Sequence, residues 1–288
     1  MLRPLGHTGL KIPPIVFGAT TLGNLFRAVS DDEKSAIVQQ WLRSGLSPVV
    51  IDTAGKYGAG LSLEVLAREL SRLGAAPDAL LISNKLAWRR VPLTTPEPTF
   101  EPGAWFGIQH DAVQDISYAG ILRCWEEGNA LLGDYRAQLV SVHDPDEYLA
   151  AAESPADRSR RLEDIVEAYR ALGELKSAGE VAAVGIGAKD WQIIRELDGH
   201  CAFDWVMFAN SFTIMSHPLE LREFIQSLAD RGVGVINSAL FHGGFLLGGN
   251  FFDYRPLNGS QPEDQQRLQW RTRFQHACRE VGVSPFQV

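Results

Sequence analysis

Four side chains that can exchange or stabilise protons lie at or just after the ends of apolar runs in this sequence. Asp52 lies near the end of "PVVIDTA", Lys85 near the end of "ALLISNKL" and His143 near the end of "AQLVSVHD", while Tyr57 follows Asp52 by five residues. A phenol is a weak acid at neutral pH, and a nearby ammonium group lowers its pKa by stabilising the phenolate. Lys85 is the candidate ammonium and Asp52 its counter-ion, while His143 can hydrogen-bond the reacting oxygen. This set predicts a proton relay at a carbonyl or carbinol group.

Short apolar runs of the kind that form buried strands position these residues. Six runs span residues 48–54, 79–86, 137–144, 181–188, 205–211 and 232–239, and residues 15–18 supply a seventh. Helical patterns lie between the runs, for example at residues 31–45, 62–74 and 160–179. Alternating strands and helices imply parallel strands joined by crossover helices. Because neighbouring strands lie about 4.8 Å apart, the four side chains are expected to converge at one face.

The glycine pattern favours a barrel over a doubly wound sheet. A doubly wound sheet that binds a dinucleotide carries G-x-G-x-x-G after its first strand. Here the first strand leads into "GATTLGN", and the nearest partial match, "GIGAKD" at residues 185–190, lacks the third glycine. We therefore predict a (β/α)8 TIM barrel, with residues 1–288 as a single domain. The doubly wound sheet remains the alternative.

Two long connections are expected at the face where barrels build their sites. They cover residues 87–115 and 145–160. The first carries Trp88, Trp105 and Phe106, which predict a packed substrate-pocket wall that can stack on a sugar face or an aromatic ring. The second is polar, and a solvated insertion explains it equally well.

Composition and charge indicate a globular protein and exclude some kinds of binding partner. The chain is 45% hydrophobic and 22% charged, which is typical of a globular protein, and its net charge of −8 without a basic run argues against nucleic acid as a partner. Its cysteines, Cys124, Cys201 and Cys278, are odd in number and widely spaced, so neither a disulfide framework nor a metal site is expected. No stretch resembles a signal peptide or a membrane span. We expect a cytoplasmic protein that binds a small molecule and no membrane.

The chemically active segments resemble those of a known family. "IDTAGKYG" with Asp52 and Tyr57, "SNK" with Lys85 and "SVHDPD" with His143 are similar, in order and spacing, to the catalytic tetrad segments of the aldo-keto reductases. The opening "RPLGHTGLKIPPIVFGATTLG" resembles that family's N-terminal hairpin and first strand. Residues 115–133, "DISYAGILRCWEEGNALLG", are more narrowly similar to the branch of L-fucose or D-threo-aldose 1-dehydrogenases and pyridoxal 4-dehydrogenases.

The resemblance implies a (β/α)8 barrel with an N-terminal hairpin that binds NADP or NAD in an extended form. Hydride would pass between the nicotinamide and a carbonyl or hemiacetal carbon of an aldose or aldehyde, while Tyr57 gives up or accepts the proton. The resemblance places the cofactor contacts after the fifth, sixth and seventh strands, at Gly187, Asn210, Ser211, Ser238, Leu240 and Phe241.

The sequence departs from the family pattern at three places. "GIGAKDW" stands where many relatives have G-V-S-N, so recognition of the carboxamide is expected to differ. Ala209 stands where the family often has glutamine, and Asn210 or Ser211 is expected to substitute. The chain ends at "VSPFQV", where relatives continue through an eighth strand and a final helix. Either the sequence is part of a longer chain or its barrel closes differently, and the preference for NAD or NADP cannot be read.

Two other functions are compatible with the sequence. One is a catalytically idle subunit on the same barrel that senses the cofactor and acts through a protein partner. The other is a barrel aldolase in which Lys85 forms a Schiff base with the substrate. The complete set of four residues argues against the first, and loss of activity in a Tyr57→Phe variant that still binds cofactor would argue against the second.

Overall fold

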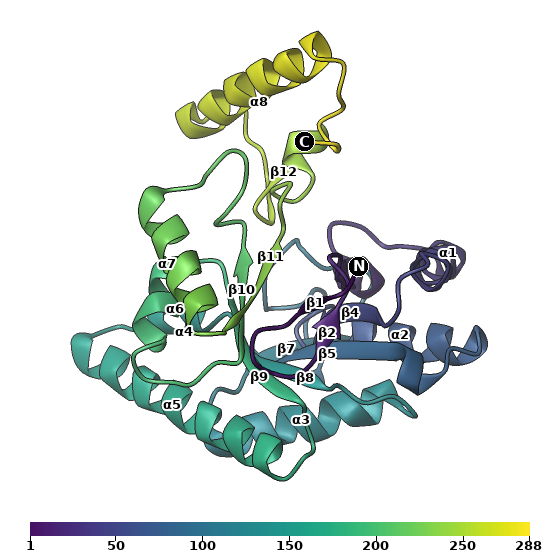
Figure 1. Ribbon diagram of the computed structural model, residues 1–288, viewed down its shortest axis with the longest axis vertical. Coiled ribbons are helices and arrows are strands. Elements are labelled where there is room, and N and C mark those ends of the chain that lie inside the picture. The colour runs from purple at the N-terminus through teal and green to yellow at the C-terminus, as the bar shows by residue number, and fades with distance from the viewer.

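The computed structural model, which describes residues 1–288, has a seven-stranded parallel sheet at its centre (Figure 1). In spatial order the strands are β3 (Phe17–Gly18), β4 (Val49–Ala54), β5 (Leu80–Leu86), β8 (Leu139–His143), β9 (Ala183–Ala188), β10 (Trp205–Ala209) and β11 (Gly234–Ser238). All seven predicted strands are therefore present. Within this sheet each strand pairs with the strand that comes next to it along the chain, with only the separate β6–β7 hairpin inserted between β5 and β8. The strand order therefore never reverses as it does in a doubly wound sheet.

This order is that of a (β/α)8-type barrel, and the barrel prediction is confirmed. The sheet curls, with β3 and β11 at its two edges and no hydrogen-bonded strand between them. The expected N-terminal hairpin is also present, as β1 (Arg3–Pro4) and β2 (Lys11–Ile12).

Eight α-helices surround the sheet or extend from it. They are α1 (Asp31–Leu42), α2 (Leu61–Arg72), α3 (Tyr118–Leu132), α4 (Pro145–Ala150), α5 (Pro155–Ser177), α6 (Trp191–Leu197), α7 (Leu219–Asp230) and α8 (Pro262–Glu280). The larger hydrophobic core lies between the sheet and its helices. In Figure 1, α8 lies apart from the sheet, beyond the hairpin of β12 (Phe251–Phe252) and β13 (Arg255–Pro256). None of these helices is both long enough and apolar enough to span a bilayer.

The inner face of the curled sheet has its own small core. Trp205 is fully buried there, on β10, beside Gly185 of β9. A Cβ atom at Gly185 would lie 2.2 Å from the indole ring, so only glycine leaves room for this tryptophan. Leu5 and Ile12, from the N-terminal hairpin, complete the inner core at the end of the sheet opposite the strand carboxyl ends.

The two long connections are more regular than their composition indicated. Residues 87–115 contain an antiparallel hairpin of β6 (Trp88–Pro92) and β7 (His110–Gln114), which leaves residues 93–109 as the loop. Residues 145–160 form α4 and the start of α5 rather than a loop. The helix-start signals were present in the sequence, because Ser154 caps α5 by accepting a hydrogen bond from the Asp157 amide and Pro155 follows at the first position.

Candidate active site

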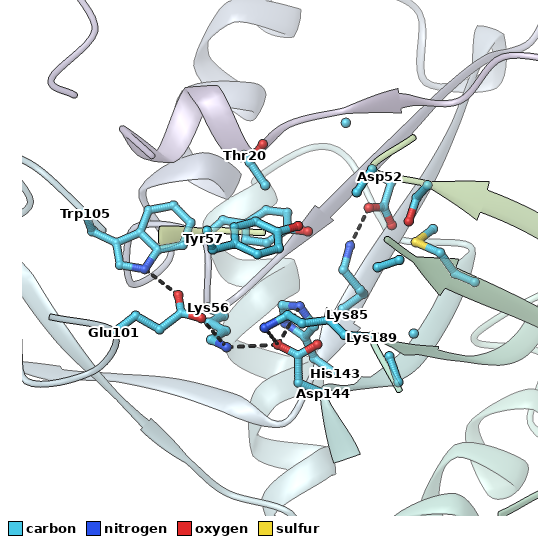
Figure 2. A pocket seen from close by; sticks show the side chains of 18 residues that line it. Thr20, Asp52, Lys56, Tyr57, Lys85, Glu101, Trp105, His143, Asp144 and Lys189 are labelled. Atoms are coloured by element: carbon cyan, nitrogen blue, oxygen red, sulfur yellow. Dashed lines mark hydrogen bonds and ion pairs between the residues drawn. The ribbon is translucent and has the colours of Figure 1, made fainter. Parts of the chain in front are cut away.

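A cavity of about 170 Å³ lies at the carboxyl ends of the parallel strands. All four side chains predicted to do chemistry line it, from β4, β5, β8 and the turn after β4: Asp52, Tyr57, Lys85 and His143. Figure 2 shows these side chains from close by. Parallel pairing brings them together, since the carboxyl ends of all the strands lie at the same edge of the sheet.

Asp52 is the counter-ion of Lys85, as predicted. The two side chains come from adjacent strands and form a buried ion pair, with Lys85 only 3% exposed. Ser83 donates a second hydrogen bond to the Asp52 carboxylate at 3.0 Å, and the Lys85 ammonium also contacts the Thr53 carbonyl at 3.4 Å. An ammonium group is costly to bury without such partners, so the strand-end carboxylate has a clear electrostatic role.

Tyr57 packs among three functional side chains. The Lys85 ammonium lies 4.8 Å from the centre of its ring, and the ring centres of His143 and Trp105 lie 5.5 and 5.9 Å away. Burial, followed by the charges of Asp52 and Asp144, raises the pKa of Tyr57 well above its ordinary value. The net direction is opposite to the lowering that Lys85 alone was expected to cause. The physical reason is that burial and the two carboxylates, one of which is paired with Lys85, penalise the phenolate more than the nearby ammonium groups stabilise it.

His143 is the last residue of β8 and is 5% exposed. Burial lowers its pKa well below the ordinary value, and the nearby Lys85, Lys56 and Lys189 ammonium groups act in the same direction, against Asp144. Its Nδ1 atom is buried without a hydrogen-bond partner. The imidazole is thus neutral near pH 7, and a neutral imidazole can donate a hydrogen bond to a carbonyl or hydroxyl oxygen.

A charged cluster that sequence reasoning missed lies at the cavity, and all of its members except Glu147 line it. It consists of two ammonium groups and three carboxylates: Lys56, Lys189, Glu101, Asp144 and Glu147. Two of its members are sequence neighbours of predicted residues, because Lys56 precedes Tyr57 and Asp144 follows His143. That adjacency was the available signal. Glu101 and Tyr254, which also lines the cavity, lie far away in sequence and gave no signal.

Only one of the three predicted aromatic wall residues lines the cavity. Trp105 does so, and its indole donates a hydrogen bond of 2.8 Å to Glu101. Trp88 lies behind Lys56, whose ammonium is 4.8 Å from the centre of its ring, and it does not reach the cavity. Phe106 points outward, with 42% of its surface exposed. Trp88 and Phe106 therefore do not line the cavity; Trp88 is the first residue of β6, and Phe106 lies in the loop between β6 and β7.

A groove of about 1120 Å³ joins the cavity and runs between the sheet edges β3 and β11. Thr20, Ser238 and Tyr254 line both spaces, so the two are continuous. Ser238, Leu240 and Phe241, which the resemblance placed at the cofactor, line the groove. Gly187 lines the cavity, where a Cβ atom would come within 3.2 Å of the Lys85 side chain. An extended ligand of dinucleotide size fits such a groove.

The other two predicted cofactor residues lie outside both spaces. The Ser211 hydroxyl is already used within the protein, since it donates to the backbone carbonyls of Lys189 and Ala209. Asn210 follows the pocket residue Ala209, and both polar atoms of its side-chain amide are buried without partners. Because this amide lies outside both spaces, the fit to a nicotinamide cofactor rests on the cavity at the strand ends and the long groove that continues from it.

Comparisons with known proteins agree with this geometry. The model of the Aldo/keto reductase family matches residues 14–288. The chain is 28% identical to pyridoxal 4-dehydrogenase of Microbacterium luteolum, over 88% of this chain and 75% of that one. It is 30% identical to D-threo-aldose 1-dehydrogenase of a Pseudomonas species, over 83% and 68% of the two chains. The solved structure of a glycerol dehydrogenase from Gluconobacter oxydans has a TM-score of 0.66 at 17% identity, covering 99% of this chain and 79% of that chain, and supports the fold alone.

Proposed function

Because this chain belongs to the aldo/keto reductase family, we propose that it is an NAD(P)-dependent oxidoreductase that moves hydride between a nicotinamide and the carbonyl or hemiacetal carbon of an aldose or aldehyde. The observation that carries the proposal is the convergence of Asp52, Tyr57, Lys85 and His143 on one cavity that opens into a long groove. The names of the two relatives, a pyridoxal 4-dehydrogenase and a D-threo-aldose 1-dehydrogenase, support an aldehyde or aldose as substrate.

Each of the four residues has a role that follows from its surroundings. The raised pKa of Tyr57 keeps its phenol protonated at neutral pH, so Tyr57 can give a proton to the substrate oxygen during reduction. Neutral His143 donates a hydrogen bond that orients this oxygen. Lys85 stabilises the phenolate that remains, and Asp52 holds Lys85 in place. A bound nicotinamide supplies or accepts the hydride, and oxidation uses the same groups in reverse.

The cofactor contacts fall into two groups. Ser238, Leu240 and Phe241 line the groove and would contact its extended part. Gly187 lines the cavity at the strand ends, where the nicotinamide would be held, and Asn210 is the residue after the cavity residue Ala209.

The structure weighs against the two alternative functions. A catalytically idle sensing subunit has no need of a buried, fully assembled set of four reactive side chains. An aldolase needs the neutral amine of Lys85 as its nucleophile, whereas the ion pair with Asp52 stabilises the charged ammonium.

The first test is a fluorescence titration of the purified chain with NADPH and separately with NADH, followed by a screen of aldoses and aldehydes with the nucleotide that binds. In the Tyr57→Phe variant, kcat should fall by about 10²–10⁴-fold, as is typical for loss of a general acid, while nucleotide binding persists. Tyr118→Phe is the matched control, since that hydroxyl lies on the outer helix α3 and bonds Glu174. Full activity of Tyr57→Phe, or no binding of either nucleotide by the wild-type protein, would refute the proposal.

A further inference from the structure

Lys56, the residue before Tyr57, lies at the centre of an ionic cluster that the four predicted residues do not include. Its side chain is 2% exposed. Its ammonium nitrogen lies 2.7 Å from Glu101, 2.9 Å from Asp144 and 2.9 Å from Glu147. An ammonium group has three N–H donors, and here each has its own carboxylate. Figure 2 shows Lys56 with Glu101 and Asp144 on one side of the pocket, away from the pair of Lys85 and Asp52.

These contacts join segments that are distant in sequence. Lys56 comes from the turn after β4, Glu101 from the loop between β6 and β7, and the other two carboxylates from the start of α4. Glu101 also accepts a hydrogen bond from the pocket residue Trp105. The cluster therefore links the backbone beside Tyr57 to the pocket wall and to the backbone beside His143.

The charges of the cluster are also close enough to His143 to affect its electrostatic environment. The Asp144 carboxylate lies 3.6 Å from Nε2 of His143 and 3.7 Å from the Lys189 ammonium. Two ammonium groups against three carboxylates leave a net charge of −1. Without Lys56 the net charge would be −2, in a buried site where charges are poorly screened.

We propose that Lys56 is a positioning residue of the active site, whose ammonium group holds Glu101, Asp144 and Glu147 together and thereby fixes Tyr57 and His143 and limits the negative charge beside them. The role in catalysis rests on the proposed function. The electrostatic role does not, because it concerns groups of the free protein. The three short contacts and the burial of the Lys56 side chain support both roles.

Removing the Lys56 charge should change the pKa of Tyr57 and the pKa of His143 in the same direction. Lys56 now opposes the raised pKa of Tyr57 and contributes to the lowered pKa of His143. Its loss raises both pKa values, so the ionisation seen in the pH profile of kcat/KM moves to higher pH. The substitution does not change the chemical identity of the other charged or titratable groups that face Tyr57 or His143, which are Asp52, Lys85, Glu101, Asp144, Lys189 and Tyr254.

The test compares Lys56→Met, Lys56→Arg and the double variant Lys56→Met/Glu147→Gln, which restores the net charge of the cluster. Lys56→Met should lower kcat/KM by about 10²-fold, the cost of a displacement of about 1 Å in a reacting group, and shift the pH profile upward. Lys56→Arg should recover most of the activity, and the double variant should return the pH profile but not the full rate. Lys34→Met is the control, because Lys34 is 4% exposed on α1 and has no ion-pair partner within 4.0 Å.

A second readout does not depend on activity. ¹⁵N-histidine NMR, with His143→Gln to assign the signal, should show the pKa of His143 rising in Lys56→Met and returning toward the wild-type value in the double variant. If the wild-type protein binds no nucleotide, the proposed function fails, and this titration still decides the electrostatic role. If Lys56→Met does not fold, the double variant is compared with Glu147→Gln alone. Unchanged kcat/KM, pH profile and His143 titration in a folded Lys56→Met protein would overturn the inference.

Discussion

Replacing Asp52 with asparagine isolates the charge of the buried pair with Lys85. Asparagine has nearly the same shape, and its side-chain oxygen can still accept the hydrogen bond from Ser83 that Asp52 accepts at 3.0 Å. The substitution therefore removes one negative charge and replaces the oxygen that accepts from Lys85 with an NH₂ donor. It leaves the Lys85 ammonium, 3% exposed, without its carboxylate.

The size of the effect follows from this burial. Breaking a buried ion pair by removing one partner costs about 3–5 kcal/mol, because the remaining charge is uncompensated. The free energy of unfolding of a typical domain is only about 5–15 kcal/mol, so the loss is a large fraction of the total. The double variant Asp52→Asn/Lys85→Met removes both charges, and its stability should return to within about 1–2 kcal/mol of the wild type.

Urea unfolding at pH 7, followed by circular dichroism, measures these differences. The control is Glu167→Gln, which breaks a surface pair with Arg170 in which both side chains are about half exposed, and it should change the free energy of unfolding by less than about 1 kcal/mol. The reasoning would be refuted if the free energy of unfolding of Asp52→Asn lay within about 1 kcal/mol of the wild-type value. It would also be refuted if the double variant were less stable than Asp52→Asn alone.

The same variant has a second, independent consequence for Tyr57. After burial, the negative charge of Asp52 makes the largest contribution to raising the pKa of this phenol. With Asp52 neutralised, the pKa of Tyr57 should fall, and the pH profile of the oxidation should move to lower pH. This shift is opposite in sign to that expected for Lys56→Met, so the two variants together test the electrostatic account of the pocket.

Two further predictions concern stability. Gly185→Ala should cost about 1–3 kcal/mol in urea unfolding, because its Cβ atom would lie 2.2 Å from the buried ring of Trp205 and the inner core must shift. Burial, aided by Asp144, raises the pKa of Asp146 to about 6, although the amides of Lys189 and Asp190 donate to its carboxylate. A carboxyl group whose pKa is raised by folding contributes stability that is fully present below about pH 4 and is lost as the pH rises through about 6. In Asp146→Asn the free energy of unfolding should therefore depend less on pH between these two values. An unchanged pH dependence would contradict this assignment.

The sequence alone determined the strands and the four residues at or just after their ends, and its glycine pattern favoured the barrel order over the doubly wound one. Buried parallel strands are continuous apolar runs, and this local property is visible without a structure. The same logic located Asp52, Lys85 and His143, since polar side chains at the ends of such runs share one edge of the sheet. The ion pair of Asp52 with Lys85 followed from the cost of burying an ammonium group.

Only the tertiary structure decided which other side chains reach the pocket and how strongly charges act there. Glu101 reaches Lys56 from a loop 45 residues away in sequence, and the direction of Trp88 depends on a hairpin that apolar periodicity did not predict. The direction of the Tyr57 pKa likewise required the burial of the phenol and the neutralisation of Lys85 by Asp52. Periodicity reports the local environment of a segment, whereas the approach of distant side chains and the loss of solvent are properties of the packed chain.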